Sequence, residues 1–327
     1  MNKAQDFYIG VDIGGTKTAM GISSRDGCIL ARSEIRTSKE PHIVLSWVTD
    51  NYLQWKNLYL HEQGSEIKGI GIGCPGPLDR TNGTILNAPN LEEWYGYPIV
   101  KHLEESCFCP VYLENDANVA ALGEFRYGAG MGYQNLVYLT ISTGIGGGII
   151  INGKLYIGTD GCAGEFGHMT IEPDGPSCKC GNNGCLEALA SGTAIMREAN
   201  EYLKAGQPTL LRELFGDTVT SEQVAHGAKM GDHIANIVIQ RAMRYLGIGI
   251  ANIMTELCPQ VIILGGGVTN IGDIMFSMVR HEVSKRVTMV NPGHIPILPA
   301  ILGRDIGIKG AIAFLMDCQN TVLPHKE

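Results

Sequence analysis

One imidazole and three thiols lie within eighteen residues of this chain. They are His168, Cys178, Cys180 and Cys185, in the segments E-F-G-H (165–168) and C-x-C-G-x-x-G-C-x-E (178–187). One nitrogen and three soft sulfurs form a ligand set that suits a four-coordinate Zn²⁺. Because protein ligands would fill all four positions, we expect this zinc to be structural.

Two other uses of these cysteines must be weighed. A secreted disulfide framework fits poorly, because ten cysteines are scattered over 327 residues. A redox C-x-x-C pair also fits poorly, since the spacing of Cys178 and Cys180 is one residue too short. Gly181 and Gly184 supply the turn that a metal-binding knuckle needs, so the spacing favours zinc.

Two carboxylates flank the predicted metal ligands. Glu165 precedes His168 by three residues, and Glu187 follows Cys185 by two. Folding of the ribbon around a metal would bring these polar groups together. We therefore expect the metal to act as a clamp on a binding site.

A glycine-rich loop, D-I-G-G-T-K at 12–17, follows the first predicted strand. Its glycines expose backbone N–H groups, and its threonine and lysine add a hydroxyl and a cation, which are the materials of a phosphate cradle. Asp12 could hold Mg²⁺ through water. The loop is not a P-loop, because the spacing differs and a strand follows it. Taken alone, it fits a plain hairpin equally well.

Two further glycine clusters follow predicted strands, at 143–148 and 265–267. They would provide a second phosphate loop and a close backbone approach to a nucleoside. The G-x-G-x-x-G at 71–76 is discounted, because Pro75 and Pro77 leave no helix N-terminus for a pyrophosphate, and NAD binding is the weaker interpretation. The residues expected to bind nucleotide are Gly10, Asp12, Gly14, Gly15, Thr16, Lys17, Thr143, Gly144, Gly146, Gly147, Gly148, Gly265, Gly266 and Gly267.

A candidate general base lies in the motif E-N-D-A-N at 114–118, where a strand is predicted to end and a helix to begin. Asp116 at such a place is often only an N-cap. The same place also points it into the crevice where α/β sheets bind ligands, and the helix dipole would keep it ionised. It could then accept the proton of a hydroxyl that attacks a γ-phosphate. Asn115 and, in A-P-N at 88–90, Asn90 could bind the same substrate through their amides.

The composition excludes several classes of protein. A net charge of −8 without a basic stripe argues against nucleic-acid binding. No apolar run approaches about 18 residues, and no secretory leader opens the chain, so we expect neither membrane spanning nor secretion and place the protein in the cytoplasm.

The order of predicted elements indicates a duplicated α/β protein. A strand, a glycine turn and a second strand occur at 7–23 and again, about 130 residues later, at 136–151. Helices are predicted at 42–60, 117–125, 234–254 and 306–316. Two copies of one unit suggest two domains with a cleft between them.

Together these motifs resemble the ROK family of sugar kinases and repressors. The resemblance rests on D-I-G-G-T-K, E-N-D-A-N, S-T-G-I-G-G-G at 142–148, E-F-G-H, the cysteine motif and G-G-G-V at 265–268, which span nearly the whole chain. It implies an actin-like, hexokinase-type (ribonuclease H-like) fold. The small domain would be 1–116, completed by a C-terminal helix at about 305–320, and the large domain, 117–304, would carry the zinc site and a homodimer interface. The terminal L-G-R-D-I-G-I-K-G-A is more basic than is usual in the family.

The resemblance also implies a division of roles. Asp116 would be the catalytic base in phosphate transfer from ATP, with Mg²⁺, to the 6-hydroxyl of a hexose. Zn²⁺ would bind His168 and the three cysteines. The side of the sugar pocket would be lined by Gly76, and the sugar hydroxyls would be held by Asn90, Asn115, Asp116, Glu165, His168 and Glu187.

The sugar itself is less well defined by the motifs. Glucose is favoured and N-acetylmannosamine is the second choice, followed by allose, fructose and N-acetylglucosamine, because epimers differ by one or two hydrogen bonds that a sequence does not locate. A repressor of the family would need an added helix-turn-helix, for which the few residues before the first strand are not enough. A non-catalytic sugar sensor and another actin-like ATPase are the remaining alternatives.

Overall fold

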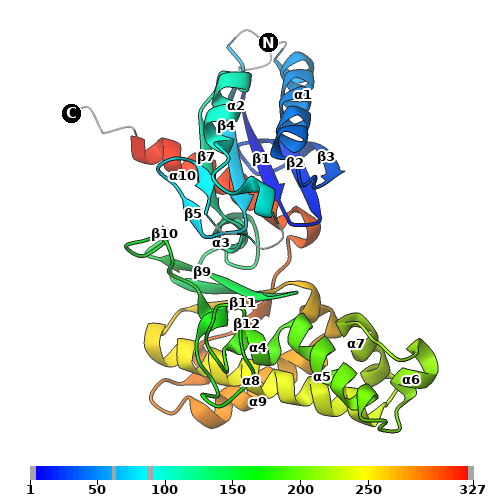
Figure 1. Cartoon of the computed structure of the whole chain (residues 1–327). Coiled ribbons are helices and arrows are strands. Elements are labelled where there is room, and N and C mark those ends of the chain that lie inside the picture. Colours follow the sequence, from blue (N-terminus) through cyan, green and yellow to red (C-terminus); the bar gives the residue numbers. More distant parts are fainter. Residues whose placement is uncertain (1–4, 61–63, 87, 89–90, 323–327) are drawn as a thin grey trace. The chain divides into compact units, whose positions relative to one another are not determined.

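The computed structural model describes residues 5–60, 64–86, 88 and 91–322. By its internal contacts the chain forms two compact units (Figure 1). Unit 1 consists of Met1–Gly132, Leu155–Ala163 and Ile301–Glu327, and unit 2 of Tyr133–Lys154 and Gly164–Ala300. The predicted boundary after residue 116 differs from this division, because the helix that begins there packs against the C-terminal helix within unit 1.

Unit 1 contains the first half of the duplicated arrangement. Its elements are β1 (Asp6–Ile13), β2 (Lys17–Ser24), β3 (Ile29–Arg36), α1 (Pro41–Tyr59), β4 (Glu66–Cys74), β5 (Leu78–Asp79), β6 (Thr84–Ile85), η1 (Glu92–Trp94), α2 (Ile99–Cys107), β7 (Val111–Asn115), α3 (Asp116–Tyr127), η5 (Gly303–Asp305) and α10 (Ile306–Val322). The main sheet has the order β3-β2-β1-β4-β7. β2 is antiparallel to β1, whereas β4 and β7 run parallel to it, so β1, β4 and β7 end at the same edge.

The side chains of β1 alternate between the two faces of this sheet. Phe7, Ile9 and Val11 join a buried core with α1 and α2. Tyr8 faces the other side, in a smaller core with Ile308 and other apolar residues of α10. The even-numbered positions of β1 are therefore covered by the C-terminal helix.

Helix α10 packs directly on the strand backbone, because glycines replace side chains at two of these positions. A Cβ at Gly10 in β1 would lie 2.2 Å from the carbonyl oxygen of Ile308, and a Cβ at Gly71 in β4 would lie 2.0 Å from that of Ala311. Any larger residue would push the helix away from the sheet. Gly10, which the sequence predicts to contact nucleotide, thus lies inside a strand and serves packing.

Unit 2 repeats the strand order of unit 1. Its elements are β8 (Leu136–Ile141), β9 (Ile145–Ile151), η2 (Phe166–His168), α4 (Leu186–Ala190), α5 (Gly192–Lys204), α6 (Leu210–Phe215), α7 (Ser221–Lys229), α8 (His233–Leu257), β11 (Val261–Gly265), η3 (Gly267–Ile271), α9 (Asp273–Arg286), η4 (Pro292–His294) and β12 (Ile297–Pro299). The sheet has the order β10-β9-β8-β11-β12, with β10 (Lys154–Tyr156) at its edge. β9 is antiparallel to β8, and β11 and β12 are parallel to it, which confirms the predicted duplication.

The second glycine turn is shorter than the sequence suggests. Gly146, Gly147 and Gly148 pair with Thr140, Leu139 and Tyr138 as part of β9, so the predicted turn at 143–148 reduces to its first two residues. Glycines are unfavourable in strand interiors unless another part of the backbone approaches closely. At Gly147 such an approach occurs, because a Cβ there would lie 2.9 Å from the carbonyl oxygen of Gly164.

No helix within the described ranges combines the length and the apolar character needed to cross a bilayer.

Replacement of Gly71 by alanine should destabilise unit 1. The added Cβ meets backbone, which cannot rotate away, and overpacking of this kind costs about 1–3 kcal/mol. We expect the thermal midpoint to fall by roughly 2–4 °C per kcal/mol, as measured by circular dichroism. Gly293→Ala is the matched control, since its nearest neighbour is a side-chain atom of Asn291 at 3.2 Å. Equal midpoints for both variants would contradict direct packing of α10.

Candidate active-site residues in the two units

The four predicted metal ligands converge in unit 2. The donor atoms of His168, Cys178, Cys180 and Cys185 all lie within 4.8 Å of one another. The Sγ atoms of Cys180 and Cys185 are 3.7 Å apart, and Cys178 Sγ is 3.6 Å from His168 Nδ1. Zinc–ligand bonds of about 2.0–2.3 Å place tetrahedral donors roughly 3.4–3.8 Å apart. The residues therefore fit a tetrahedral Zn²⁺, and a sulfur separation of 3.7 Å excludes a disulfide between this pair.

Short backbone hydrogen bonds shape the ribbon that carries these ligands. The N–H of Cys178 donates to the carbonyl oxygen of Asn182 at 2.7 Å, and Gly181 donates to Cys178 at 3.0 Å. Gly181 and Gly184 have φ values of 93° and 63°, which glycine adopts without strain. The knuckle is thus formed by the glycines predicted for it, and α4 begins directly after Cys185.

The two carboxylates that flank the ligands in the sequence make different contacts. Glu165 Oε2 is 3.9 Å from His168 Nε2, the ring nitrogen that faces away from the sulfurs. Glu187 Oε2 accepts a hydrogen bond of 2.9 Å from the N–H of Ile145, at the start of β9. A Cβ at Gly144 would lie 2.3 Å from the same oxygen. One predicted sugar ligand therefore also holds the turn between β8 and β9.

In unit 1, the sequence left open whether Asp116 is only the N-cap of the helix that follows it. The structure gives the N-cap position to Asn115. Asn115 is the N-cap of α3, and its Oδ1 accepts from the N–H groups of Ala117 and Asn118 at 2.9 and 3.3 Å. Asp116 is the first helical residue, and one of its oxygens accepts from Ala117 N–H at 2.8 Å. The N-cap is therefore Asn115, and Asp116 is exposed to solvent.

Asp12, near the end of β1, and Asp116, directly after β7, are close enough for their negative charges to interact. Loss of hydration, and then the nearby charge of Asp116, raise the pKa of Asp12 to about 6. Although part of the Asp116 side chain is accessible to solvent, the protein atoms that surround it reduce its hydration and raise its pKa, against the lowering effect of its hydrogen bond from Ala117. Gly307, in the first turn of α10, makes room for this pair, since a Cβ there would lie 2.3 Å from Asp12 Cγ. A divalent cation would be stabilised beside these two carboxylates, because its charge would offset their repulsion.

A buried ion pair that the sequence analysis missed supports the same loop. Glu114, whose side chain is 1% exposed, receives two hydrogen bonds from Arg80, one of them at 2.9 Å from Nε. The other bonds to Glu114 come from the N–H of Asn115 at 2.8 Å and from Nδ2 of Asn118 at 3.0 Å. Arg80 also donates to the carbonyl oxygen of Gly161 at 3.2 Å. Glu114 stands within E-N-D-A-N, but its partner lies 34 residues away, and no sequence signal joins the two.

Gly76 lies beside the amide of Asn115, since a Cβ at Gly76 would be 3.3 Å from Asn115 Nδ2. The structure thus brings two of the predicted sugar-binding residues together. Asn90, which is also predicted to bind the sugar, lies outside the described residues.

The loop at 12–17 forms a tight hairpin between β1 and β2. Gly14 N–H donates to the carbonyl oxygen of Lys17 at 3.0 Å. Thr37, a residue that the motif did not reveal, donates to the carbonyl oxygen of Gly14 at 2.7 Å. Lys17 Nζ lies 3.2 Å from Glu34 on β3. Gly15 and Thr16 are exposed at the tip, so backbone and hydroxyl groups are accessible, while the lysine is paired.

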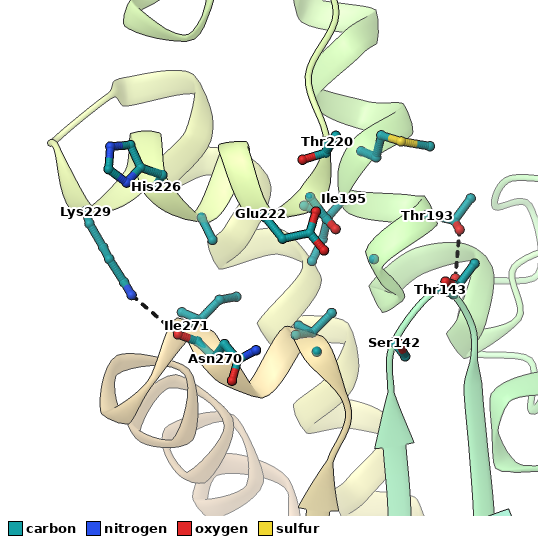
Figure 2. A pocket seen from close by; sticks show the side chains of 16 residues that line it. Ser142, Thr143, Thr193, Ile195, Thr220, Glu222, His226, Lys229, Asn270 and Ile271 are labelled. Atoms are coloured by element: carbon teal, nitrogen blue, oxygen red, sulfur yellow. Dashed lines mark hydrogen bonds between the residues drawn. The ribbon is translucent and has the colours of Figure 1, made fainter. Parts of the chain in front are cut away.

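Unit 2 contains a cavity of about 510 Å³ (Figure 2). It is lined by the turn between β8 and β9, by α5, by α7 and by η3. Thr143 and Gly267 are the lining residues predicted to bind nucleotide, whereas Gly266 is held by packing, with φ 88° and a Cβ position 2.3 Å from the carbonyl oxygen of Ile141. The contributions of Thr193 and Glu222 were not predicted, because α5 and α7 carry no glycine motif.

Comparison with known proteins places these residues in context. The family model described as ROK family matches residues 8–317. A glucokinase of Thermotoga maritima is 35% identical over 315 residues, which cover 94% of this chain and 97% of that protein. A xylose repressor of Bacillus spizizenii is 32% identical and matches 97% of this chain but 78% of its own length.

Two solved structures are similar in fold. The ROK hexokinase of Thermus thermophilus has a TM-score of 0.83 and 34% identity, covering 96% of this chain and 99% of its own. A ROK family glucokinase of Streptomyces griseus in complex with glucose and AMPPNP has a TM-score of 0.78 and 33% identity, covering 95% and 99%. These similarities confirm the predicted actin-like α/β fold.

The cysteine cluster should bind a metal that stabilises unit 2. Removal of zinc by a strong chelator, or Cys180→Ser, should lower the thermal midpoint and weaken sugar binding together, because the ligands also position Glu165 and His168. Metal content by mass spectrometry and sugar binding by calorimetry test this. Cys258→Ser, an exposed cysteine outside the cluster, is the control. Loss of nucleotide affinity alone would contradict the role of the metal as a clamp.

Substitutions of Arg80 and Glu114 should have strongly non-additive effects on the free energy of unfolding. Arg80→Met leaves a buried carboxylate without its cation and should destabilise the protein by about 3–5 kcal/mol. In a Glu114→Gln background the same change should have a much smaller effect, because no charge is left unpaired. Unfolding midpoints of the four proteins in the cycle measure this coupling, and additive effects would show that the pair does not support the Asn115–Asp116 loop.

Proposed function

Because this chain belongs to the ROK family, we propose that it is an ATP-dependent sugar kinase that phosphorylates the 6-hydroxyl of a hexose, with glucose as the preferred substrate. The observation that carries the proposal is the position of Asp116. Asn115 caps α3, so the neighbouring carboxylate is exposed and available for chemistry.

Asp116 would act as the general base. A carboxylate with a raised pKa is a stronger base than an ordinary aspartate, and it can take the proton of a hydroxyl as that oxygen attacks the γ-phosphorus. Hydrogen bonds from Ala117 N–H and from the side chain of Asn115 orient this carboxylate. The buried pair of Glu114 and Arg80 holds the loop in this geometry.

Asp12 is the residue that would hold Mg²⁺, through water. Bound Mg²⁺ would neutralise charge on the phosphates of ATP. Asp12 lies at the end of β1, where clustered negative charge and lost hydration raise its pKa, and a cation would relieve that repulsion. The adjacent hairpin presents Gly15 and Thr16 for phosphate contacts.

The sugar would be held by the ribbon of unit 2, and Asn115 and Gly76 of unit 1 are the residues of the other unit that would contribute contacts. With Nδ1 of His168 directed at the sulfurs, its Nε2 would carry the proton and donate to a sugar hydroxyl. Glu165 and Glu187 supply acceptors on either side of it, and neutral hydroxyls need this mixture of donors and acceptors. A structural Zn²⁺ on the four ligands would fix their orientation.

The cavity of unit 2 would bind the nucleoside of ATP. Its volume of about 510 Å³ is in the usual range for small-molecule sites. Thr143 and Gly267 lie on its wall, at the two glycine turns for which the sequence predicts nucleotide contacts.

Glucose is favoured over the other sugars because the similar proteins named above include glucokinases, one of them solved with glucose and AMPPNP. N-acetylmannosamine is the second candidate, followed by allose, fructose and N-acetylglucosamine. A non-catalytic sugar sensor or repressor is the candidate from another class, since a xylose repressor is also similar. We also propose a homodimer, as the family resemblance implies.

The protein should release ADP from ATP when glucose is added, and Asp116→Asn should reduce this rate by at least about 10²-fold. Glucose binding should survive, because the amide keeps the hydrogen-bonding shape. The rate should fall as the pH drops through the raised pKa of Asp116, since the base must be ionised. A coupled spectrophotometric assay over the five sugars measures both the activity and the preference.

Asp217→Asn is the matched control, because this exposed aspartate of unit 2 lies outside the site. Full activity of Asp116→Asn would exclude it as the base. Tight sugar binding without ADP release for any of the five sugars would favour the sensor.

A further inference from the structure

The cavity of unit 2 contains an acidic side chain to which the proposed function gives no role. Glu222 is the second residue of α7 and lies on the wall of this cavity. Figure 2 shows its side chain directed into the space between Thr143 on one side and Asn270 on the other. No ion pair involves it among the residues that the structure describes.

Local structure orders the start of the helix that carries Glu222 and keeps its carboxyl ionised. Thr220 is the N-cap of α7 and forms a capping box with Gln223, so the start of the helix is well ordered. The N–H of Glu222 itself, and then the hydroxyl of Thr220, lower the pKa of the Glu222 carboxyl. Its negative charge is thus present at neutral pH.

That charge orients any nucleotide in the cavity. An ionised carboxylate is only an acceptor, and it repels phosphate. The phosphates must therefore lie away from Glu222, towards Thr143 and Gly267, where a hydroxyl and an open glycine backbone line the wall. The part of the nucleotide beside Glu222 must offer hydrogen-bond donors.

The vicinal hydroxyls of ribose are such donors. The two oxygens of a carboxylate can accept from two adjacent hydroxyls at once, and an acidic residue binds ribose hydroxyls in this way in dinucleotide-binding folds. Two other polar side chains of the cavity already have hydrogen-bond partners. Lys229 Nζ is engaged with the carbonyl oxygen of Asn270 at 3.4 Å, and Thr193 Oγ1 with that of Thr143 at 2.7 Å.

We propose that Glu222 is the residue that selects ribonucleoside triphosphates, by accepting hydrogen bonds from the 2′- and 3′-hydroxyls of the ribose. This assignment rests on the proposed function, because it takes the cavity as the nucleoside site. It predicts that phosphate donors without a ribose diol, such as 2′-deoxy-ATP, 3′-deoxy-ATP and inorganic tripolyphosphate, bind more weakly than ATP.

Calorimetric titration of the full chain without sugar tests the assignment. The wild type should bind 2′-deoxy-ATP and 3′-deoxy-ATP at least about 10-fold more weakly than ATP, since hydrogen bonds to charged groups are strong. Glu222→Ala should weaken ATP binding by a similar factor and reduce the difference between ATP and its deoxy analogues to less than about 2-fold. Glu222→Asp should restore part of the discrimination.

Glu213→Ala, which removes an exposed glutamate of α6 outside the cavity, is the control and should retain the wild-type pattern. The assignment would be overturned if Glu222→Ala kept the wild-type difference in affinity between ATP and its deoxy analogues, or if the wild type showed no such difference. Inosine triphosphate provides a further arm. If Glu222→Ala changes the ratio of ATP to inosine triphosphate and not the difference between ATP and its deoxy analogues, the carboxylate contacts the base and the ribose assignment is wrong.

The outcome is separable from that of the proposed function, because the titrations need no turnover. Ribose-dependent binding through Glu222 in a protein that phosphorylates none of the five sugars would refute the kinase proposal and leave the nucleotide site. If the protein phosphorylates a sugar, and Glu222→Ala still binds deoxy-ATP more weakly than ATP by the wild-type factor, the kinase proposal would stand and the ribose assignment would be refuted.

Discussion

Direct contact between the backbone of α10 and the sheet of unit 1 is the constraint on which this part of the molecule depends. The helix is close enough to the strands that neither Gly10 nor Gly71 could carry a Cβ without meeting a carbonyl oxygen. A second contact of the same kind joins α10 to α3, where a Cβ at Gly310 would lie 1.8 Å from the carbonyl oxygen of Val119. Through these contacts the last helix of the chain sets the positions of β1, β4 and α3 together, and with them the carboxylates of Asp12 and Asp116.

The fold holds these two carboxylates in surroundings that disfavour their ionised forms. Lost hydration raises the pKa of both, and the mutual repulsion adds to the effect at Asp12. Such an arrangement persists only where surrounding structure determines it, and here the buried pair of Glu114 and Arg80 is the nearest support. Charges that weaken the fold are common where chemistry requires them, since a base or a cation ligand must be partly dehydrated to be effective.

Unit 2 organises its chemistry by a different principle. A short ribbon is shaped by backbone hydrogen bonds, and it brings the donor atoms of one histidine and three cysteines within 4.8 Å of one another. Glu187 then ties the helix after the last ligand to the turn between β8 and β9, and Thr143 of that turn lines the cavity where Glu222 stands. The ribbon that carries the histidine and the three cysteines is therefore connected to the wall of the cavity through the carboxylate of Glu187.

The amino-acid sequence alone was enough to predict the local features: the cluster of one histidine and three cysteines, the knuckle glycines, the helix expected at 117–125, the repeated hairpins and the long helix α8. These follow from spacing and from backbone preferences within a few residues, and the structure agrees with them. Other features emerge only once the chain is folded: the packing role of Gly10 and Gly71, the place of Gly146–Gly148 in a strand, and the N-cap at Asn115. The same holds for the pairing of Arg80 with Glu114 and for the place of Glu222 on the cavity wall. These depend on which surfaces meet across tens to hundreds of residues, and a glycine or a charge carries no local sign of the neighbour that requires it.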